Sequence, residues 1–180
     1  SIGVLPDLLT FTSLATACAK AGRWKESLTL LDDAVHRHGI SPDRIMYTSV
    51  IKACASEGRW KEAMKVCATM RKRKILMDNV AYNAIITACG NAGKWDVALK
   101  VRHLMCREGF EPDHYTYTAL VSAFDKGGEG ERVSTLFRDM VAEVELMTNK
   151  PDIKKFTAPF NAIIKYHMGV GAIDTGLQVF

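Results

Sequence analysis

The five cysteines of this chain have the side chains best suited to bind a metal ion or to form disulfide bonds. Three of them, Cys18, Cys54 and Cys89, recur at one equivalent position of a repeated pattern. Equivalent positions in a stack of repeats lie about one repeat apart, which is too far for a shared metal ion or a disulfide. We therefore interpret these three as small buried hydrophobic residues. Cys67 and Cys106 complete no pairing pattern, which favours a reducing compartment.

Other groups capable of chemistry are sparse. His103 and Cys106 are three residues apart in a helical pattern, which is more typical of a surface pair than of half a metal site. The basic run 71–74 ends a predicted helix, where it either contacts phosphates or complements the helix dipole. We find no zinc-deaminase motif, no acidic cluster of a nuclease and no glycine-rich phosphate loop. The sequence thus predicts no enzyme, no metal site and no cofactor.

The composition is that of a folded protein, with 48% hydrophobic and 24% charged residues. Its net charge of +4 is compatible with a polyanionic partner but too small to require one. No apolar run approaches the roughly 20 residues that cross a bilayer, so we expect no membrane partner. Because the chain starts without methionine and stops within a helical pattern, we expect a fragment of a longer protein, with any targeting peptide outside it.

Apolar residues recur at i, i+3, i+4 and i+7 in four successive segments, and this spacing predicts amphipathic helices. The stripe is too narrow for a fully buried helix. Its members are Phe11, Leu14, Ala15 and Cys18; Tyr47, Val50, Ile51 and Cys54; Tyr82, Ile85, Ile86 and Cys89; and Tyr117, Leu120, Val121 and Phe124.

Glycine follows three of these helices at a constant offset and tryptophan comes two residues later, as Gly22 and Trp24, Gly58 and Trp60, and Gly93 and Trp95. Glycine there supplies the left-handed backbone that ends a helix. A tryptophan at every hairpin corner favours a wedge that packs the two helices together over a platform for stacking bases.

A second helix follows each tryptophan with the same apolar spacing. Its stripe is Ser27, Leu30, Leu31 and Ala34; then Ala63, Val66, Cys67 and Met70; then Ala98, Val101, Arg102 and Met105. Arg102 interrupts the last stripe, and we expect its charged head to reach the surface. Two units then close with Pro-Asp, a turn signal before the next helix.

These signals divide the chain into repeats of 35 or 36 residues, each expected to fold as a helix-turn-helix hairpin. The fourth repeat carries an insertion near 143–150. We predict an all-α fold, an α-solenoid of stacked hairpins, because each hairpin must bury its apolar face on its neighbours. The predicted repeats are 8–43, 44–78, 79–113 and 114–156, followed by a partial repeat 157–180.

The unit resembles the pentatricopeptide repeat, with repeats similar to the P type. The resemblance rests on Val80-Ala81-Tyr82-Asn83-Ala84-Ile85-Ile86, Ala92-Gly93-Lys94, Ala98-Leu99, Met105 and Gly109-Phe110-Glu111-Pro112-Asp113. The tetratricopeptide repeat is excluded because its tryptophan stands in the first helix. The resemblance implies a right-handed superhelix and a sequence-specific binder of single-stranded RNA in mitochondria or chloroplasts, with one base per repeat.

In this family the fifth and last residues of each repeat face the base edge, and an apolar second residue packs on the base. The resemblance implies as fifth residues Thr12, Thr48, Asn83 and Thr118, as last residues Asp43, Asp78, Asp113 and, by motif, Asp152, and as second residues Leu9, Ile45, Val80 and Tyr115. Thr with Asp favours guanine and Asn with Asp favours uracil, so the first three repeats imply a core of 5′-GGU-3′. By register the fourth repeat ends at Phe156 instead and would lack a readable pair.

Two alternatives remain open at this stage. Thr and Asp near a helix start are common N-caps, so these residues have a structural interpretation that does not exclude readout. The array is either a free binder of organellar transcripts or a scaffold subunit of a larger ribonucleoprotein, such as an organellar ribosome, with ribosomal or other subunits as partners. A third possibility is an enzyme whose catalytic domain lies beyond Phe180. The sequence indicates no small-molecule substrate.

Overall fold

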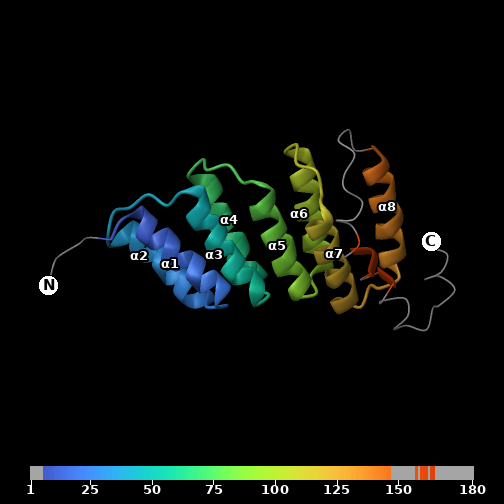
Figure 1. Cartoon of the computed structure of the whole chain (residues 1–180), viewed down its shortest axis with the longest axis horizontal. Helices are drawn as coiled ribbons and strands as arrows, with labels where there is room; N and C mark the ends of the chain where they lie inside the picture. Colours follow the sequence, from blue (N-terminus) through green and yellow to red (C-terminus); the bar gives the residue numbers. More distant parts are fainter. Residues whose placement is uncertain (1–5, 147–156, 158, 162, 165–180) are drawn as a thin grey trace. The chain divides into compact units, whose positions relative to one another are not determined.

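The computed structural model describes residues 6–146, 157, 159–161 and 163–164. Residues 8–146 form helices of similar length joined by short turns (Figure 1). The helices are α1 (Leu8–Lys20), α2 (Trp24–His36), α3 (Arg44–Ser56), α4 (Trp60–Lys72), α5 (Asn79–Asn91), α6 (Trp95–Arg107), α7 (His114–Lys126) and α8 (Arg132–Leu146).

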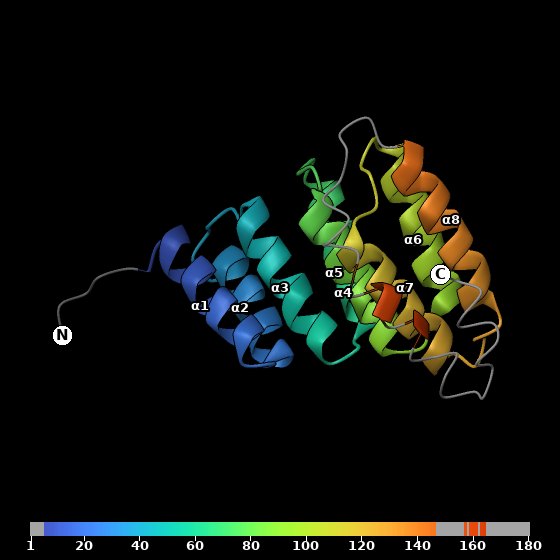
Figure 2. The ribbon, with the colours of Figure 1, turned by 45° about the vertical axis from the view of Figure 1, so that its right-hand side comes forward.

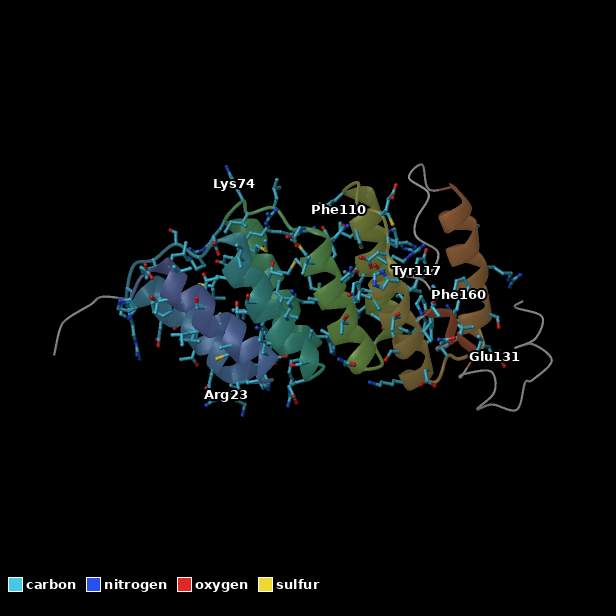
Figure 3. All side chains as sticks on the ribbon, viewed as in Figure 1. Arg23, Lys74, Phe110, Tyr117, Glu131 and Phe160 are labelled. Atoms are coloured by element: carbon cyan, nitrogen blue, oxygen red, sulfur yellow. The ribbon has the colours of Figure 1, made fainter. Side chains whose placement is uncertain are left out.

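Contacts divide the chain into an N-terminal unit, 1–88, and a C-terminal unit, 89–180, with the division inside α5. In the N-terminal unit α1 packs against α2 and α3, and α3 packs against α2 and α4 (Figure 2). Figure 3 places Arg23, in the turn of the first hairpin, and Lys74, in a loop between hairpins, at opposite ends of these helices. In the C-terminal unit α7 packs against α6 and α8. Each unit is therefore built from antiparallel hairpins stacked side by side.

The turn inside each hairpin follows the predicted glycine signal. The glycines after α1, α3, α5 and α7 have positive φ angles, namely Gly22 at 69°, Gly58 at 63°, Gly93 at 64° and Gly128 at 75°. The next residue donates its backbone N–H across the turn to a carbonyl at the end of the apolar stripe, as from Arg59 to Cys54 at 2.9 Å. This hydrogen bond satisfies a carbonyl that the ending helix leaves without a partner. The tryptophans begin α2, α4 and α6 as predicted.

The predicted apolar stripes form the core. Tyr47, Tyr82 and Tyr117, at one equivalent position of α3, α5 and α7, are fully buried. Burial in α3 is wider than its stripe predicts and includes Met46 and Ser49. The reason is that α3 packs against three helices, whereas the stripe marks the side of the helix that faces its own hairpin. The hydroxyl of Ser49 forms a hydrogen bond with that of Thr16 on α1, with the two oxygens 3.0 Å apart.

Arg102 corrects a sequence-based expectation, because its head does not reach the surface. The residue is only 7% exposed, and its guanidinium carbon lies 5.8 Å from the centre of the Tyr117 ring. The aromatic face of the neighbouring repeat offers the cation an attractive site inside the C-terminal unit. A single sequence position cannot reveal that partner, which stands in the next repeat.

The cysteines behave mostly as predicted. Cys54 and Cys89 are fully buried, and burial raises the pKa of the Cys54 thiol to about 11 and that of Cys89 to about 12. Both thiols therefore stay protonated and unreactive at neutral pH. Cys67 is buried, Cys18 is half-buried and Cys106 is exposed. Among the described residues, no group of three or more possible ligands is arranged to hold a metal ion.

The tryptophans also contact the following repeat. In the N-terminal unit the Arg59 guanidinium lies 4.9 Å from the centre of the Trp24 ring. In the C-terminal unit Trp95 stacks on Phe124, with ring centres 6.0 Å apart, and the Arg132 guanidinium lies 4.5 Å from the Trp95 ring. The wedge that the sequence predicts within one hairpin thus also joins successive hairpins.

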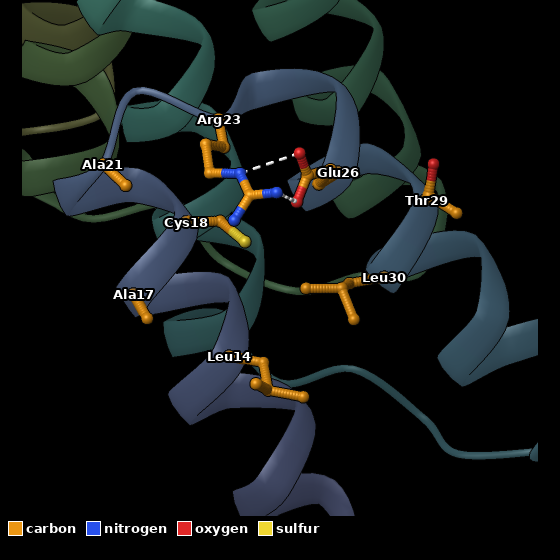
Figure 4. Close-up of a pocket in the computed structure, with 8 residues that line it drawn as sticks. All are labelled: Leu14, Ala17, Cys18, Ala21, Arg23, Glu26, Thr29 and Leu30. Atoms are coloured by element: carbon orange, nitrogen blue, oxygen red, sulfur yellow. Dashed lines mark hydrogen bonds and ion pairs between the residues drawn. The ribbon is translucent and has the colours of Figure 1, made fainter.

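A cavity of about 490 Å³ opens on one side of α1 and α2 (Figure 4). It is lined by Leu14, Ala17, Cys18, Ala21, Arg23, Glu26, Thr29 and Leu30. Leu14 and Cys18 are partly exposed there, whereas their equivalents Val50 and Cys54 in α3 are fully buried. Among the described helices, α3 packs against α1, α2 and α4, whereas α1 packs against α2 and α3.

Across the part of the chain that the structure describes, no helix is both long enough and apolar enough to span a membrane. Helix α8 has 15 residues, two more than the 13 of α7. It covers the start of the insertion predicted near 143–150, and the remainder of the insertion lies outside the described residues. The repeat boundaries stay a prediction, although α1, α3, α5 and α7 begin at the residues where the proposed repeats begin.

Candidate nucleic-acid interface

The second residue of each first helix is an exposed large hydrophobic residue. The exposed fractions are 72% for Leu9, 60% for Ile45, 46% for Val80 and 64% for Tyr115. Phe11 and the equivalent tyrosines, which stand two positions after these second residues, are buried. Two positions along an α-helix correspond to a rotation of about 200° about its axis. The second residues therefore point away from the core. An apolar side chain repeated at one exposed position is what a surface that packs on planar bases requires.

The last residue of each repeat caps the next first helix. One carboxylate oxygen accepts a backbone N–H in each case, from Met46 to Asp43 at 2.8 Å and from Ala81 to Asp78 at 2.9 Å. Asp113 accepts from the backbone of Tyr115 and Thr116, both at 3.0 Å, in a capping box. The capping interpretation of these aspartates is thus confirmed. In Asp43 and Asp78 the cap uses one of the two carboxylate oxygens, Oδ1.

In repeat 2 an ion pair holds the last residue, Asp78, beside α3, the helix that carries the fifth residue of the same repeat. The Arg44 Nε atom lies 3.5 Å from Asp78 Oδ2. Arg44 begins α3, and Thr48 stands four residues later, one helical turn along. Asp78 therefore lies near the first turn of α3, the helix that carries Thr48, its proposed partner in repeat 2.

The four fifth residues differ in how their polar atoms are engaged. The hydroxyl oxygens of Thr12 and Thr48 are buried without a hydrogen-bond partner among the described residues. The Thr118 hydroxyl donates to the carbonyl of His114 at 2.7 Å. An unsatisfied hydroxyl is costly to bury, and a threonine rotation would present it to a ligand. Asn83 is half-buried in the N-terminal unit, whereas Asp113, its proposed partner, is in the C-terminal unit.

The basic run 71–74 divides into residues with different contacts. Arg71 Nη2 donates to the hydroxyl of the buried Tyr82 at 3.0 Å, so this arginine joins α4 to α5. Arg71 and Lys72 occupy the last turn of α4, where a cation complements the helix dipole. Lys74 has a positive φ of 59° and is exposed. Lys72, Arg73 and Lys74 remain candidates for phosphate contact.

Models of one repeat family match most of this chain. They are described as PPR repeat family, pentatricopeptide repeat domain and PPR repeat, and together they run without a gap from residue 9 to residue 143. The chain belongs to the pentatricopeptide repeat family. The matched residues are 77–126 for the first model, 29–92 for the second, and 9–37 and 115–143 for the third.

Solved pentatricopeptide repeat structures share the fold. The crystal structure of PPR10 from maize matches with a TM-score of 0.75 at 28% identity, over 99% of this chain and 24% of that one. The structure of PPR10 in complex with an 18-nt psaJ RNA element matches with a TM-score of 0.73 at 22% identity, over 100% of this chain and 28% of that one. The chain thus spans about a quarter of the PPR10 chains.

A shorter relative is matched over most of its own length. The PPR domain of Arabidopsis thaliana protein-only RNase P 1, in complex with tRNA, has a TM-score of 0.69 at 17% identity, over 93% of this chain and 83% of that one. Together with PPR10, this likeness confirms the predicted all-helical solenoid of hairpins. Among curated proteins, none matches the chain significantly.

Three residues of the pentatricopeptide surface were not predicted. Asp7 caps α1 by accepting from the Thr10 backbone at 2.8 Å, and hydrogen bonds from Thr10 lower the pKa of its carboxyl. The Pro6-Asp7 signal, which matches Pro42-Asp43, could have identified it. The His114 ring lies 4.0 Å from that of Tyr115 and extends the aromatic surface there. Arg44 is the third, and no sequence signal marks its ion pair.

Two further predictions concern the end of repeat 4 and the pair His103 and Cys106. Asp152, and Phe156 as its alternative, lie outside the described residues, so the last residue of repeat 4 keeps both assignments. His103 and Cys106 are both exposed on α6, as a surface pair would be.

Proposed function

We propose that this pentatricopeptide array binds single-stranded RNA through the first turns of α1, α3, α5 and α7 and performs no catalysis itself. The observation that carries the proposal is the exposed apolar second residue repeated in all four first helices. Exposed apolar side chains are costly in water and pack favourably on base faces. RNA in the PPR10 complex supports the same partner for this chain.

The preferred core that we propose is about 5′-GGU-3′, read by the fifth and last residues of repeats 1 to 3. Hydroxyl, amide and carboxylate groups distinguish donor from acceptor patterns on base edges, which apolar contacts do not. By family resemblance we place the protein in the mitochondrion or chloroplast, where it would stabilise, process or help translate a transcript.

A scaffold role in a larger organellar ribonucleoprotein is the second candidate. One relative supports contact with structured RNA, because the PPR domain of protein-only RNase P 1 is in complex with tRNA. In that case the array would contact folded RNA and protein, for example in an organellar ribosome, rather than read a linear sequence.

The second residues provide the test of RNA binding. We expect the double variant Ile45→Ser and Val80→Ser to bind a short single-stranded RNA about tenfold more weakly, because two apolar base contacts are lost. Fluorescence anisotropy at about 0.15 M salt measures the affinity. Met64→Ser removes an exposed apolar side chain from the second helix α4 and is the matched control. If the double variant binds as tightly as Met64→Ser, the first turns are not the RNA surface.

A further inference from the structure

A groove of about 330 Å³ lies between the second helices α2 and α4 of the N-terminal unit. Its lining includes the buried apolar residues Leu31 and Val66, and the fully buried Tyr47 of α3 also lines it. Lys65 of α4 and Arg73, the residue directly after α4, line it and are exposed. The groove therefore combines an apolar floor with a cationic edge.

Tyr47 brings an unused hydrogen-bond donor to this groove. Within the described residues its hydroxyl has no hydrogen-bond partner, whereas the equivalent hydroxyl of Tyr82 accepts from Arg71 at 3.0 Å. Burial raises the pKa of the Tyr47 phenol, and the positive charge of Arg73 opposes part of that rise. The phenol is thus neutral near pH 7 and keeps a proton to donate. A ligand acceptor in the groove could receive this proton.

The cationic edge is also uncompensated. Neither Lys65 nor Arg73 forms an ion pair with another described residue. Asp32, the one carboxylate that lines the groove, lies 3.5 Å from His36 Nε2 on its own helix. A guanidinium, an ammonium and a phenol proton around an apolar floor together suit a carboxylate carried by an apolar segment.

We propose that this groove, between α2 and α4, binds a glutamate or aspartate side chain flanked by apolar residues on a protein partner. A backbone phosphate of RNA carries the same single charge but fits less well, because the phosphate group has no apolar part to pack on Leu31 and Val66. The groove is formed mainly by second helices, whereas the exposed second residues belong to first helices. Apart from Arg73, which is also a candidate for phosphate contact, the groove uses none of the residues proposed to bind RNA, and it adds a protein partner to the array.

The test uses two peptides, acetyl-Leu-Glu-Leu-Leu-amide and the same peptide with Gln in place of Glu. Titration of the ¹⁵N-labelled protein is followed by NMR. We expect the Glu peptide to shift amide signals of α2 and α4 around the groove, and the Gln peptide to bind about tenfold more weakly because the charge-assisted hydrogen bonds are lost. Equal binding of the two peptides, or no shift with either, would overturn the proposal.

Variants then assign the site to its residues. Tyr47→Phe and Arg73→Gln are each expected to weaken the Glu peptide about three- to tenfold. Phenylalanine already occupies the equivalent position as Phe11, and Arg73 is exposed, so both variants should fold. Arg107→Gln removes a cation from the last turn of α6 and is the control. Unchanged affinity in both groove variants, or displacement of the peptide by single-stranded RNA, would contradict the assignment.

Discussion

Asn83→Thr is expected to change the base preferred by repeat 3 from uracil to guanine. Among the fifth residues of repeats 1 to 4, Asn83 is the one that is not threonine, and it occupies the same position of its helix as Thr48. If the fifth residue reads the base edge, the threonine variant should prefer GGG over GGU by about tenfold, the reverse of the parent. Binding of short RNAs that differ only at the third base measures the change.

The control for this swap is Asn91→Thr, a change of the same type at the exposed last residue of α5. It leaves the first turn intact and should keep the preference for GGU. An unchanged preference in Asn83→Thr would mean that repeat 3 does not read a base.

Gly93→Ala is expected to destabilise the C-terminal unit by about 3 kcal/mol. The backbone of Gly93 has a φ of 64°, where an added Cβ costs about 1–2 kcal/mol. That Cβ would also stand 2.9 Å from the carbonyl oxygen of Lys126 at the end of α7. Because the crowded atom is backbone, the next repeat must shift, at a further cost of about 1–3 kcal/mol. Chemical denaturation measures the loss.

Gly128→Ala separates the two contributions. Gly128 has the equivalent position and a φ of 75°, but no atom lies within 4 Å of an added Cβ. We therefore expect it to lose only the backbone term, about 1–2 kcal/mol. Equal losses in the two variants would show that the close approach of the Lys126 carbonyl to Gly93 adds no cost.

The elements of the fold were predictable because their signals are local and are repeated. The apolar stripe, the glycine and the tryptophan each mark a position within one hairpin. Because each signal recurs three or four times, the pattern can be recognised despite a single exception such as Arg102. Features between repeats were not predictable. The cation over the Tyr117 ring, the contact of Arg59 with Trp24 and the crowding of Gly93 by Lys126 each depend on a residue of the next repeat.

The family resemblance proposes the positions of the candidate site, but the burial and hydrogen bonding of these residues could not be predicted from the sequence. The family resemblance indicates which residues face the ligand, and the structure adds that the second residues are exposed and that the aspartates are N-caps. The buried, unpartnered hydroxyl of Thr48 has no sequence signal, since its burial comes from the helices packed around α3. The ion pair of Arg44 with Asp78 likewise depends on how the loop before α5 folds back.

The central claim is linear readout of RNA by the first turns. Its most direct test is the affinity of the unmodified chain for two single-stranded RNAs, identical except that one carries GGU and the other AAU, at about 0.15 M salt. Readout by repeats 1 and 2 predicts that GGU binds at least about tenfold more tightly. Equal affinity for the two RNAs would contradict linear readout and leave the scaffold role as the better account.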